Sequence, residues 1–120
     1  MTVTIRNAIP RDAATIAGFQ LAMAQETEEK QLELGVVRPA VDEVLANPSR
    51  GFYLVGEVGG DVAGSLMVTY EWSDWRNSNI WYIQSVYVQR QYRGRGVFKN
   101  LYQTVLEQAR LQGAGYVRLY

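Results

Sequence analysis

The pattern of apolar and polar residues in the first part of the chain predicts one strand followed by a helix. Residues 3–8 alternate apolar and polar side chains and include β-branched members, which is typical of a strand. Asp12 can cap a helix whose apolar positions recur at helical spacing, at Ile16, Phe19 and Met23. We expect this helix to fray within the polar residues 25–31.

A second, shorter helix is predicted around Pro39. Proline is favoured in the first turn of a helix, and the apolar residues that follow fall on one face, at Val41, Val44 and Leu45. Asn47 and Pro48 then end the helix. Two helices therefore follow the first strand.

Residues 52–71 predict a hairpin. Two runs of strand-forming residues, 52–58 and 62–71, flank the turn Gly59-Gly60-Asp61. Residues 72–79 are polar and aromatic, and we expect them to form a loop.

The last part predicts a strand, a helix and a further strand. Residues 80–88 form an almost continuous run of strand formers, as expected for a central strand that is buried on both faces. Apolar side chains then recur at helical spacing over 97–111, glycines at 113 and 115 end the helix, and 116–120 begin a strand. This order predicts a βαβ crossover with two parallel strands.

Composition limits both the architecture and the chemistry. A chain of 120 residues that is 48% hydrophobic can bury one core, so we expect a single domain over residues 1–120. The sequence has no Cys and no His, which excludes the usual zinc sites, thiol nucleophiles and Ser–His–Asp triads, and we expect no metal. Because we find neither a signal peptide nor a membrane-spanning segment, we expect a cytoplasmic protein with no membrane partner.

Charge is unevenly distributed along the chain. The net charge is zero, which argues against a nucleic-acid partner. Residues 1–79 nevertheless carry a net charge of −5 and residues 80–120 a net charge of +5. Such a distribution suits a domain that holds an anionic ligand beside a cationic one, although segregation of this size also arises by chance.

The candidate chemistry lies in the turn between the central strand and the long helix. Gly94 and Gly96 let the backbone approach a ligand closely, and the following helix directs unpaired N–H groups outward. Four basic side chains accompany them: Arg90, Arg93, Arg95 and Lys99. The turn suits phosphate, but it lacks the third glycine of a dinucleotide fingerprint and the GK[ST] of a Walker loop. The glycines alone are equally consistent with an exposed turn whose arginines are solvated.

The whole segment is more specific than its glycines. Gln91-x-x-Gly94-x-Gly96, preceded by Val86-Tyr87-Val88 and followed by the 97–109 helix, closely resembles the acyl-CoA signature of the GNAT (GCN5-related) N-acetyltransferases. The predicted element order over the whole chain is similar to theirs. The resemblance implies an α/β fold in which helices flank a mixed central sheet, here without the usual C-terminal helix and strands.

The resemblance also implies a cofactor, acetyl-CoA. Its pyrophosphate would bind the backbone N–H groups of the turn, from Arg93 and Gly94 through Arg95, Gly96 and Val97 to Phe98. Its pantetheine arm would lie like an extra strand against the backbone of Val86, Tyr87 and Val88.

The family's reaction is direct attack of a primary amine on the thioester. A carboxylate commonly takes the proton of the amine. Our candidate base is Glu71, at the end of a predicted strand, where a merely solvated carboxylate is equally expected. Tyr82 is a weaker catalytic candidate, since most strand tyrosines are packing residues.

The resemblance places acceptor recognition in the segments 25–37 and 71–79. Glu26, Glu29, Trp72 and Trp75 could attract and stack on a cationic amine of a small molecule or peptide. The simpler interpretation of each residue is an ordinary solvated side chain.

Two further functions stay open at this point. The chain could be a catalytically incomplete coenzyme A-binding module or fragment, completed by a partner chain, because members of the family normally continue with a helix and two strands. Strand edges near 116–120 would then invite pairing with another subunit, such as a second copy in a homodimer. A basic module that binds nucleic acid is the least favoured alternative.

Overall fold

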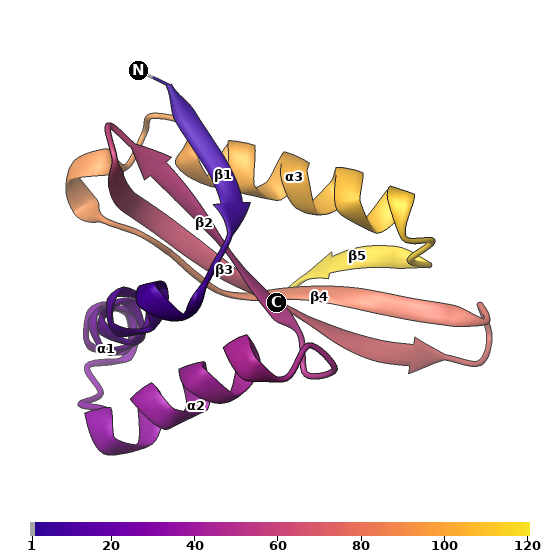
Figure 1. Ribbon diagram of the computed structural model, residues 1–120, viewed down its shortest axis with the longest axis horizontal. Helices are drawn as coiled ribbons and strands as arrows, with labels where there is room; N and C mark the ends of the chain where they lie inside the picture. The colour runs from indigo at the N-terminus through magenta and orange to yellow at the C-terminus, as the bar shows by residue number, and fades with distance from the viewer. Residues whose placement is uncertain (1) are drawn as a thin grey trace.

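The computed structural model describes residues 2–120, which form a five-stranded mixed sheet with helices on both faces (Figure 1). The strands are β1 (Val3–Asn7), β2 (Phe52–Val58), β3 (Asp61–Ser73), β4 (Ser78–Val88) and β5 (Tyr116–Leu119), in that spatial order. The helices are α1 (Ala13–Glu28), α2 (Leu34–Ala46) and α3 (Val97–Leu111). Neighbouring strands are antiparallel except β4 and β5, which are parallel, as the sequence predicted.

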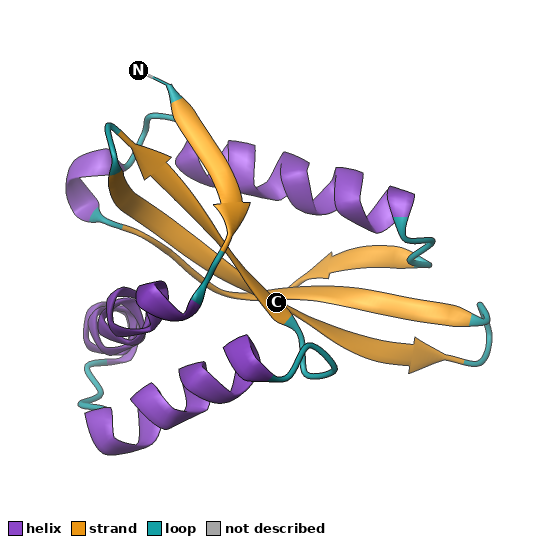
Figure 2. Cartoon of the chain, viewed as in Figure 1, coloured by secondary structure: helices purple, strands orange, loops and turns teal. Residues whose placement is uncertain are grey.

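Helix α3 covers one face of the sheet (Figure 2). Its predicted bounds and its apolar stripe are confirmed, since Leu101 and Val105 are fully buried against Leu66 and Ile83 of the sheet. Burial of each such side chain stabilises the fold by about 1.5–3 kcal/mol. This packing fixes the N-terminus of α3 relative to the end of β4.

Helices α1 and α2 cover the opposite face. Ile16 of α1 and Val41 of α2 pack with Tyr53 and Val55 of β2 in a second buried cluster. Helix α1 ends at Glu28, within the stretch where fraying was predicted. Every helix in residues 2–120 is too short or too polar to cross a membrane.

The predicted cap of α1 is confirmed in its position but not in its hydrogen bonding. Asp12 occupies the N-cap position, but its carboxylate makes no cap hydrogen bond to α1. It accepts instead from the Ile9 amide at 2.8 Å and from both Nη atoms of Arg6, at 2.8 and 2.9 Å. A 3₁₀ turn over Pro10–Asp12 directs the carboxylate back toward β1, where the guanidinium holds it.

The predicted start of α2 is wrong, because the helix begins at Leu34 and contains Pro39 in its interior. The amides of Val36 and Val37 already donate to the carbonyl of Glu33, so the first turn has formed before the proline. Pro39 removes one backbone hydrogen-bond donor from the helix. The helix nevertheless continues past it, because Val41 is packed in the second buried cluster.

Half of the expected loop at 72–79 is strand. Trp72 pairs with Asn79 and Ser73 with Ser78, which leaves a short turn over 74–77 with Asn77 at φ 51°. The expectation that 80–88 is buried on both faces is only partly met. Ile80, Trp81 and Ile83 are buried, and 84–88 are half-buried, because β5 pairs with the first part of β4 alone.

Candidate functional site

Strand β4 changes its register in the middle. Tyr87 pairs with Ser65 and Gln84 with Met67, so β4 carries one more residue than β3 over this stretch. Ser85 adopts φ 54°, a left-handed conformation that a strand residue rarely takes. Such a bulge bends a strand and redirects its side chains.

Beyond the bulge, side chains on the two faces of β4 pack toward different helices. Val86 and Val88 pack toward the α3 side, whereas the ring of Tyr87 lies 5.2 Å from the ring of Phe19 on α1. The last bond between the parallel strands runs from the Tyr120 amide to the Ile83 carbonyl, at 2.9 Å. Among the described strands, none pairs with 84–88 on that side.

The turn after β4 has the backbone that its glycines predict. A 3₁₀ turn over Arg90–Tyr92 leads to Gly94 at φ 78° and Gly96 at φ 82°, and α3 begins at Val97. A Cβ added at Gly94 would meet no atom within 4 Å, so the backbone is open to a ligand there. Gln91 lies in this turn and donates to the side chain of Gln89, at 3.2 Å.

Two cavities follow the α3 side of β4. One of about 190 Å³ lies at the turn, between Val88, Gly94, Gly96 and Lys99. Another of about 260 Å³ lies between Val86, Phe98, Leu119 and Tyr120. Phe98 lines both of them, so they follow one another along β4 and reach the N-terminus of α3. Helix N-termini favour anions because their first N–H groups lack intrahelical acceptors.

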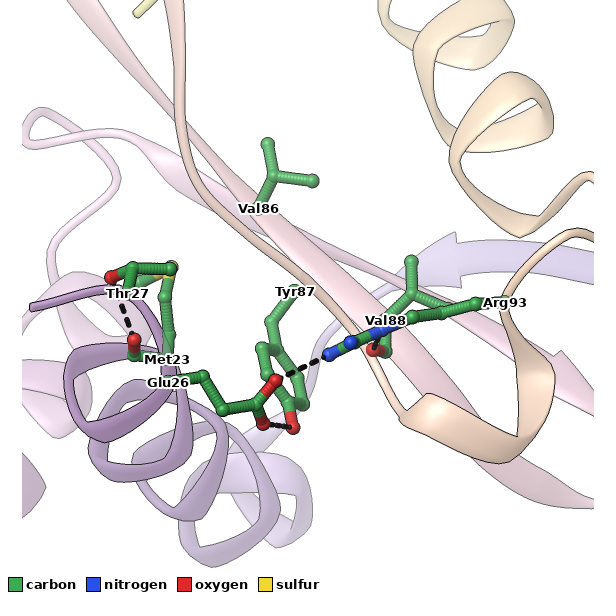
Figure 3. A pocket seen from close by; sticks show the side chains of 7 residues that line it. All are labelled: Met23, Glu26, Thr27, Val86, Tyr87, Val88 and Arg93. Carbon is green, nitrogen blue, oxygen red and sulfur yellow. Dashed lines mark hydrogen bonds and ion pairs between the residues drawn. The ribbon is translucent and has the colours of Figure 1, made fainter. Parts of the chain in front are cut away.

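A third cavity, of about 390 Å³, lies on the α1 side of β4 (Figure 3). Its apolar wall comes from Met23 and Val86, and its polar groups come from Glu26, Tyr87 and Arg93. Figure 3 shows the last three side chains converging from α1, β4 and the glycine turn.

Glu26 is the centre of that polar group. The Tyr87 hydroxyl donates to its Oε2 at 2.5 Å, and Nη2 of Arg93 donates to its Oε1 at 2.9 Å. Arg90 adds an ion pair at 3.4 Å. The hydrogen bond from Tyr87, followed by that from Arg93, lowers the pKa of Glu26 below its ordinary value. Burial, and then the hydrogen bond to Glu26, raises the pKa of Tyr87.

Glu71 and Tyr82 also interact directly. The Tyr82 hydroxyl donates to Oε2 of Glu71 at 2.8 Å and accepts from Nη1 of Arg118 at 3.0 Å. The contact with Glu71 is the main cause that raises the pKa of Tyr82. The ring of Tyr120 lies 5.7 Å from that of Tyr82.

The other residues proposed for acceptor recognition lie elsewhere. Trp72 is 61% exposed near the end of β3, and Trp75 is 96% exposed in the following turn. That hairpin tip lies at the opposite end of the molecule from α1 (Figure 1). Glu29 is exposed just after α1, at φ 52°. The structure therefore brings Glu26 to the glycine turn and leaves both tryptophans apart from it.

Some residues of the site were missed in the sequence. Met23 and Thr27 line the α1-side cavity, and Arg118 contacts Tyr82. The unequal charge of the two halves of the chain was the available signal, since it suited a domain that holds an anionic ligand beside a cationic one. The charge distribution did not indicate which acidic residue would contact Arg93.

Comparisons with known proteins give consistent results. The model of the Acetyltransferase (GNAT) family matches residues 17–120. The crystal structure of a possible acetyltransferase from Clostridium difficile 630 is 39% identical, with a TM-score of 0.92 over 100% of this chain and 80% of that one. A comparison with curated proteins gives no match.

More distant structures share the fold. Ribosomal-protein-alanine N-acetyltransferase from Brucella melitensis is 18% identical, with a TM-score of 0.81 over 99% of this chain and 79% of that one. A predicted acetyltransferase with acetyl-CoA from Clostridium acetobutylicum is 14% identical, with a TM-score of 0.81 over 99% of this chain and 80% of that one.

Proposed function

The chain belongs to the acetyltransferase (GNAT) family, and from this premise we propose that it transfers an acetyl group from acetyl-CoA to a primary amine of a small molecule or peptide. Transfer proceeds by direct attack of the amine, within one domain that spans residues 1–120. The single observation that carries the proposal is the open backbone of Gly94 beside the N-terminus of α3.

The glycine turn fits the pyrophosphate of the coenzyme. The direction in which a side chain at Gly94 would point is empty, so an anion can approach the backbone closely. Lys99 and Arg93 line the same cavity and add positive charge. Because one exposed helix-end contact with an anion contributes only about 0.3–1 kcal/mol, several N–H groups and side chains must act together.

The bulged part of β4 fits the pantetheine arm. Val86 and Val88 border the two cavities on the α3 side, which lead from Tyr120 to the turn. Amides of an extended ligand can pair with strand amides as an added strand does. The α3 side of β4 therefore holds the coenzyme.

The α1 side of β4 suits the acceptor amine. Val86 borders cavities on both sides of the strand, so a ligand on one side can meet a ligand on the other there. Met23 offers an apolar surface, and the carboxylate of Glu26 can attract an ammonium group.

Chemistry requires an activated acyl group and a neutral amine. Acetyl-CoA supplies the acetyl group as a thioester when it is bound. Glu71 takes the ammonium proton, with Tyr82 holding the carboxylate in place through their 2.8 Å hydrogen bond. Tyr82 precedes the Ser85 bulge by three residues, or about 10 Å along a strand, so the proton passes through water.

An acetylation assay tests the function. The purified chain is mixed with acetyl-CoA and a panel of small amines, polyamines and peptides, and both coenzyme A release and the mass of each amine are measured. The proposal predicts a gain of one acetyl group on at least one amine, with stoichiometric release of coenzyme A. Binding of acetyl-CoA without transfer to any amine would contradict it and favour a coenzyme A-binding module.

A further inference from the structure

Arg93 connects the two sides of β4. It lines both the cavity at the glycine turn and the cavity on the α1 side. Its Nε donates to the Val88 carbonyl at 2.8 Å, and its Nη2 donates to Glu26 at 2.9 Å. Its guanidinium lies 5.4 Å from the ring centre of Tyr87. One side chain thus contacts both predicted ligand sites.

The contacts of Arg93 occupy groups that the ligands would need. The Val88 carbonyl is a backbone acceptor at the end of β4, where the pantetheine arm would pair. The Glu26 carboxylate is the acidic group of the α1-side cavity, and Arg93 and Arg90 already compensate its charge. In this arrangement a ligand would have to compete with Arg93 for both groups.

These contacts can be exchanged at low cost. The side chains of Arg93 and Glu26 are 43% and 25% exposed, and ion pairs of this kind are weak and screened by salt. A pyrophosphate at the turn offers Arg93 a doubly charged partner with several acceptor oxygens. In this exchange Arg93 gives up a singly charged carboxylate and gains a doubly charged pyrophosphate as its partner.

We propose that Glu26 and Arg93 form a latch that the anionic end of coenzyme A opens. When the coenzyme binds at the turn, Arg93 moves from Glu26 to the phosphate and leaves the Val88 carbonyl. Glu26 then faces the α1-side cavity with less of its charge compensated, and it binds the ammonium group of the acceptor. This inference rests on the proposed function and adds a reason for coenzyme to bind before amine.

The latch makes a definite prediction about affinity. Because Glu26 competes with the coenzyme for Arg93, Glu26→Gln should bind acetyl-CoA about two- to fivefold more tightly, the range that exposed ion pairs contribute. Tyr87→Phe removes the other hydrogen bond that fixes Glu26 and should tighten binding less. Both affinities are measured by calorimetric titration with acetyl-CoA.

Two controls separate the latch from a general effect of charge. Glu28→Gln removes an exposed carboxylate from the same turn of α1 and should leave the affinity at the wild-type value. In an Arg93→Gln background, Glu26→Gln should no longer change the affinity, since the competing partner is absent.

The outcomes distinguish the latch from the proposed function. Tightening in Glu26→Gln that disappears without Arg93 supports the latch. Unchanged or weaker binding in Glu26→Gln, or equal tightening in Glu28→Gln, overturns the latch while wild-type binding of acetyl-CoA leaves the proposed function standing. Failure of the wild-type chain to bind acetyl-CoA would overturn both.

Discussion

The Tyr87 hydroxyl lies 2.5 Å from Oε2 of Glu26, and this hydrogen bond joins the bulged end of β4 to the last turns of α1. The ring of Phe19 packs against Tyr87 and holds it toward the helix. The glycine turn reaches the same carboxylate through Arg93. Three segments that are distant in the sequence therefore meet at Glu26.

The pKa of Glu26 depends on its contacts with Tyr87 and Arg93. Its pKa is lowered, so these contacts are fully formed above the ordinary Glu pKa of about 4.3 and are lost as the pH falls through the lowered value. A carboxyl-carbon NMR titration should find the Glu26 pKa below its ordinary range and closer to it in Tyr87→Phe. Titration of Glu26 at the same pH in both proteins would show that the hydroxyl is not its partner.

Substitutions of Gly94 and Gly113 should have similar effects on stability but different effects on acetyl-CoA binding. Gly94 and Gly113 have φ values of 78° and 73°, and a Cβ at either meets no atom within 4 Å. Alanine at each should therefore cost a similar free energy of unfolding, about 1 kcal/mol. Only Gly94→Ala should weaken acetyl-CoA binding, by about tenfold, which corresponds to losing two helix-end contacts.

Denaturant unfolding and calorimetric titration measure the two effects in parallel. Gly113→Ala is the matched control, because Gly113 follows the other end of α3. Equal loss of affinity in the two variants would mean that the turn at Gly94 has no special part in binding the coenzyme.

The Asp12 carboxylate should contribute to stability in a pH-dependent way. Its side chain is 5% exposed and accepts two hydrogen bonds from Arg6. These hydrogen bonds are the main reason why the pKa of Asp12 is lowered. That contribution is present above the unfolded pKa of about 3.9 and is lost as the pH falls through the folded value. Asp12→Asn should lower the free energy of unfolding by about 1.5–3 kcal/mol at neutral pH.

Urea unfolding at pH 7 and pH 3 checks this prediction. The difference between wild type and Asp12→Asn should shrink at the lower pH. Asp42→Asn is the control, since Asp42 forms an exposed ion pair with Arg38 and should change stability by less than about 1 kcal/mol. A difference that is equal at both pH values would rule out the ion pair as its source.

The assignment of Glu71 as base predicts a kinetic effect without a binding effect. Glu71→Gln should lower kcat by about 10²- to 10⁴-fold, as the loss of a general base does, with acetyl-CoA affinity unchanged. Glu107→Gln, on the exposed face of α3, should leave kcat at the wild-type value. Steady-state kinetics on the best acceptor amine provide the measurement, and a wild-type kcat in Glu71→Gln would exclude Glu71 as base.

Long periodic segments were predictable from the sequence. Helix α3 has its predicted bounds because Leu101, Val105 and Ala109 recur on the face that the sheet buries. The hairpin tip was not predictable, because Trp72, Ser73, Ser78 and Asn79 pair across the strands without an apolar pattern. Pairing between strands is a tertiary property that overrides local propensity.

The glycine turn was also predictable, whereas its surroundings were not. Gly94 and Gly96 adopt the positive φ values that their residue type suggests. Ser85 has no sequence signal for a bulge, and its position depends on the register of β4 against β3. The contact between Glu26 and Arg93 spans 67 residues and could be seen only once α1 was placed beside β4.

Binding of acetyl-CoA to the turn is the central claim, and a calorimetric titration of this 120-residue chain tests it most directly. Dephosphorylated pantetheine, which lacks the pyrophosphate, is the control ligand. We predict saturable binding of acetyl-CoA and much weaker binding of pantetheine. No binding by the folded chain, or equal affinity for the two ligands, would contradict the assignment of the glycine turn as the pyrophosphate site.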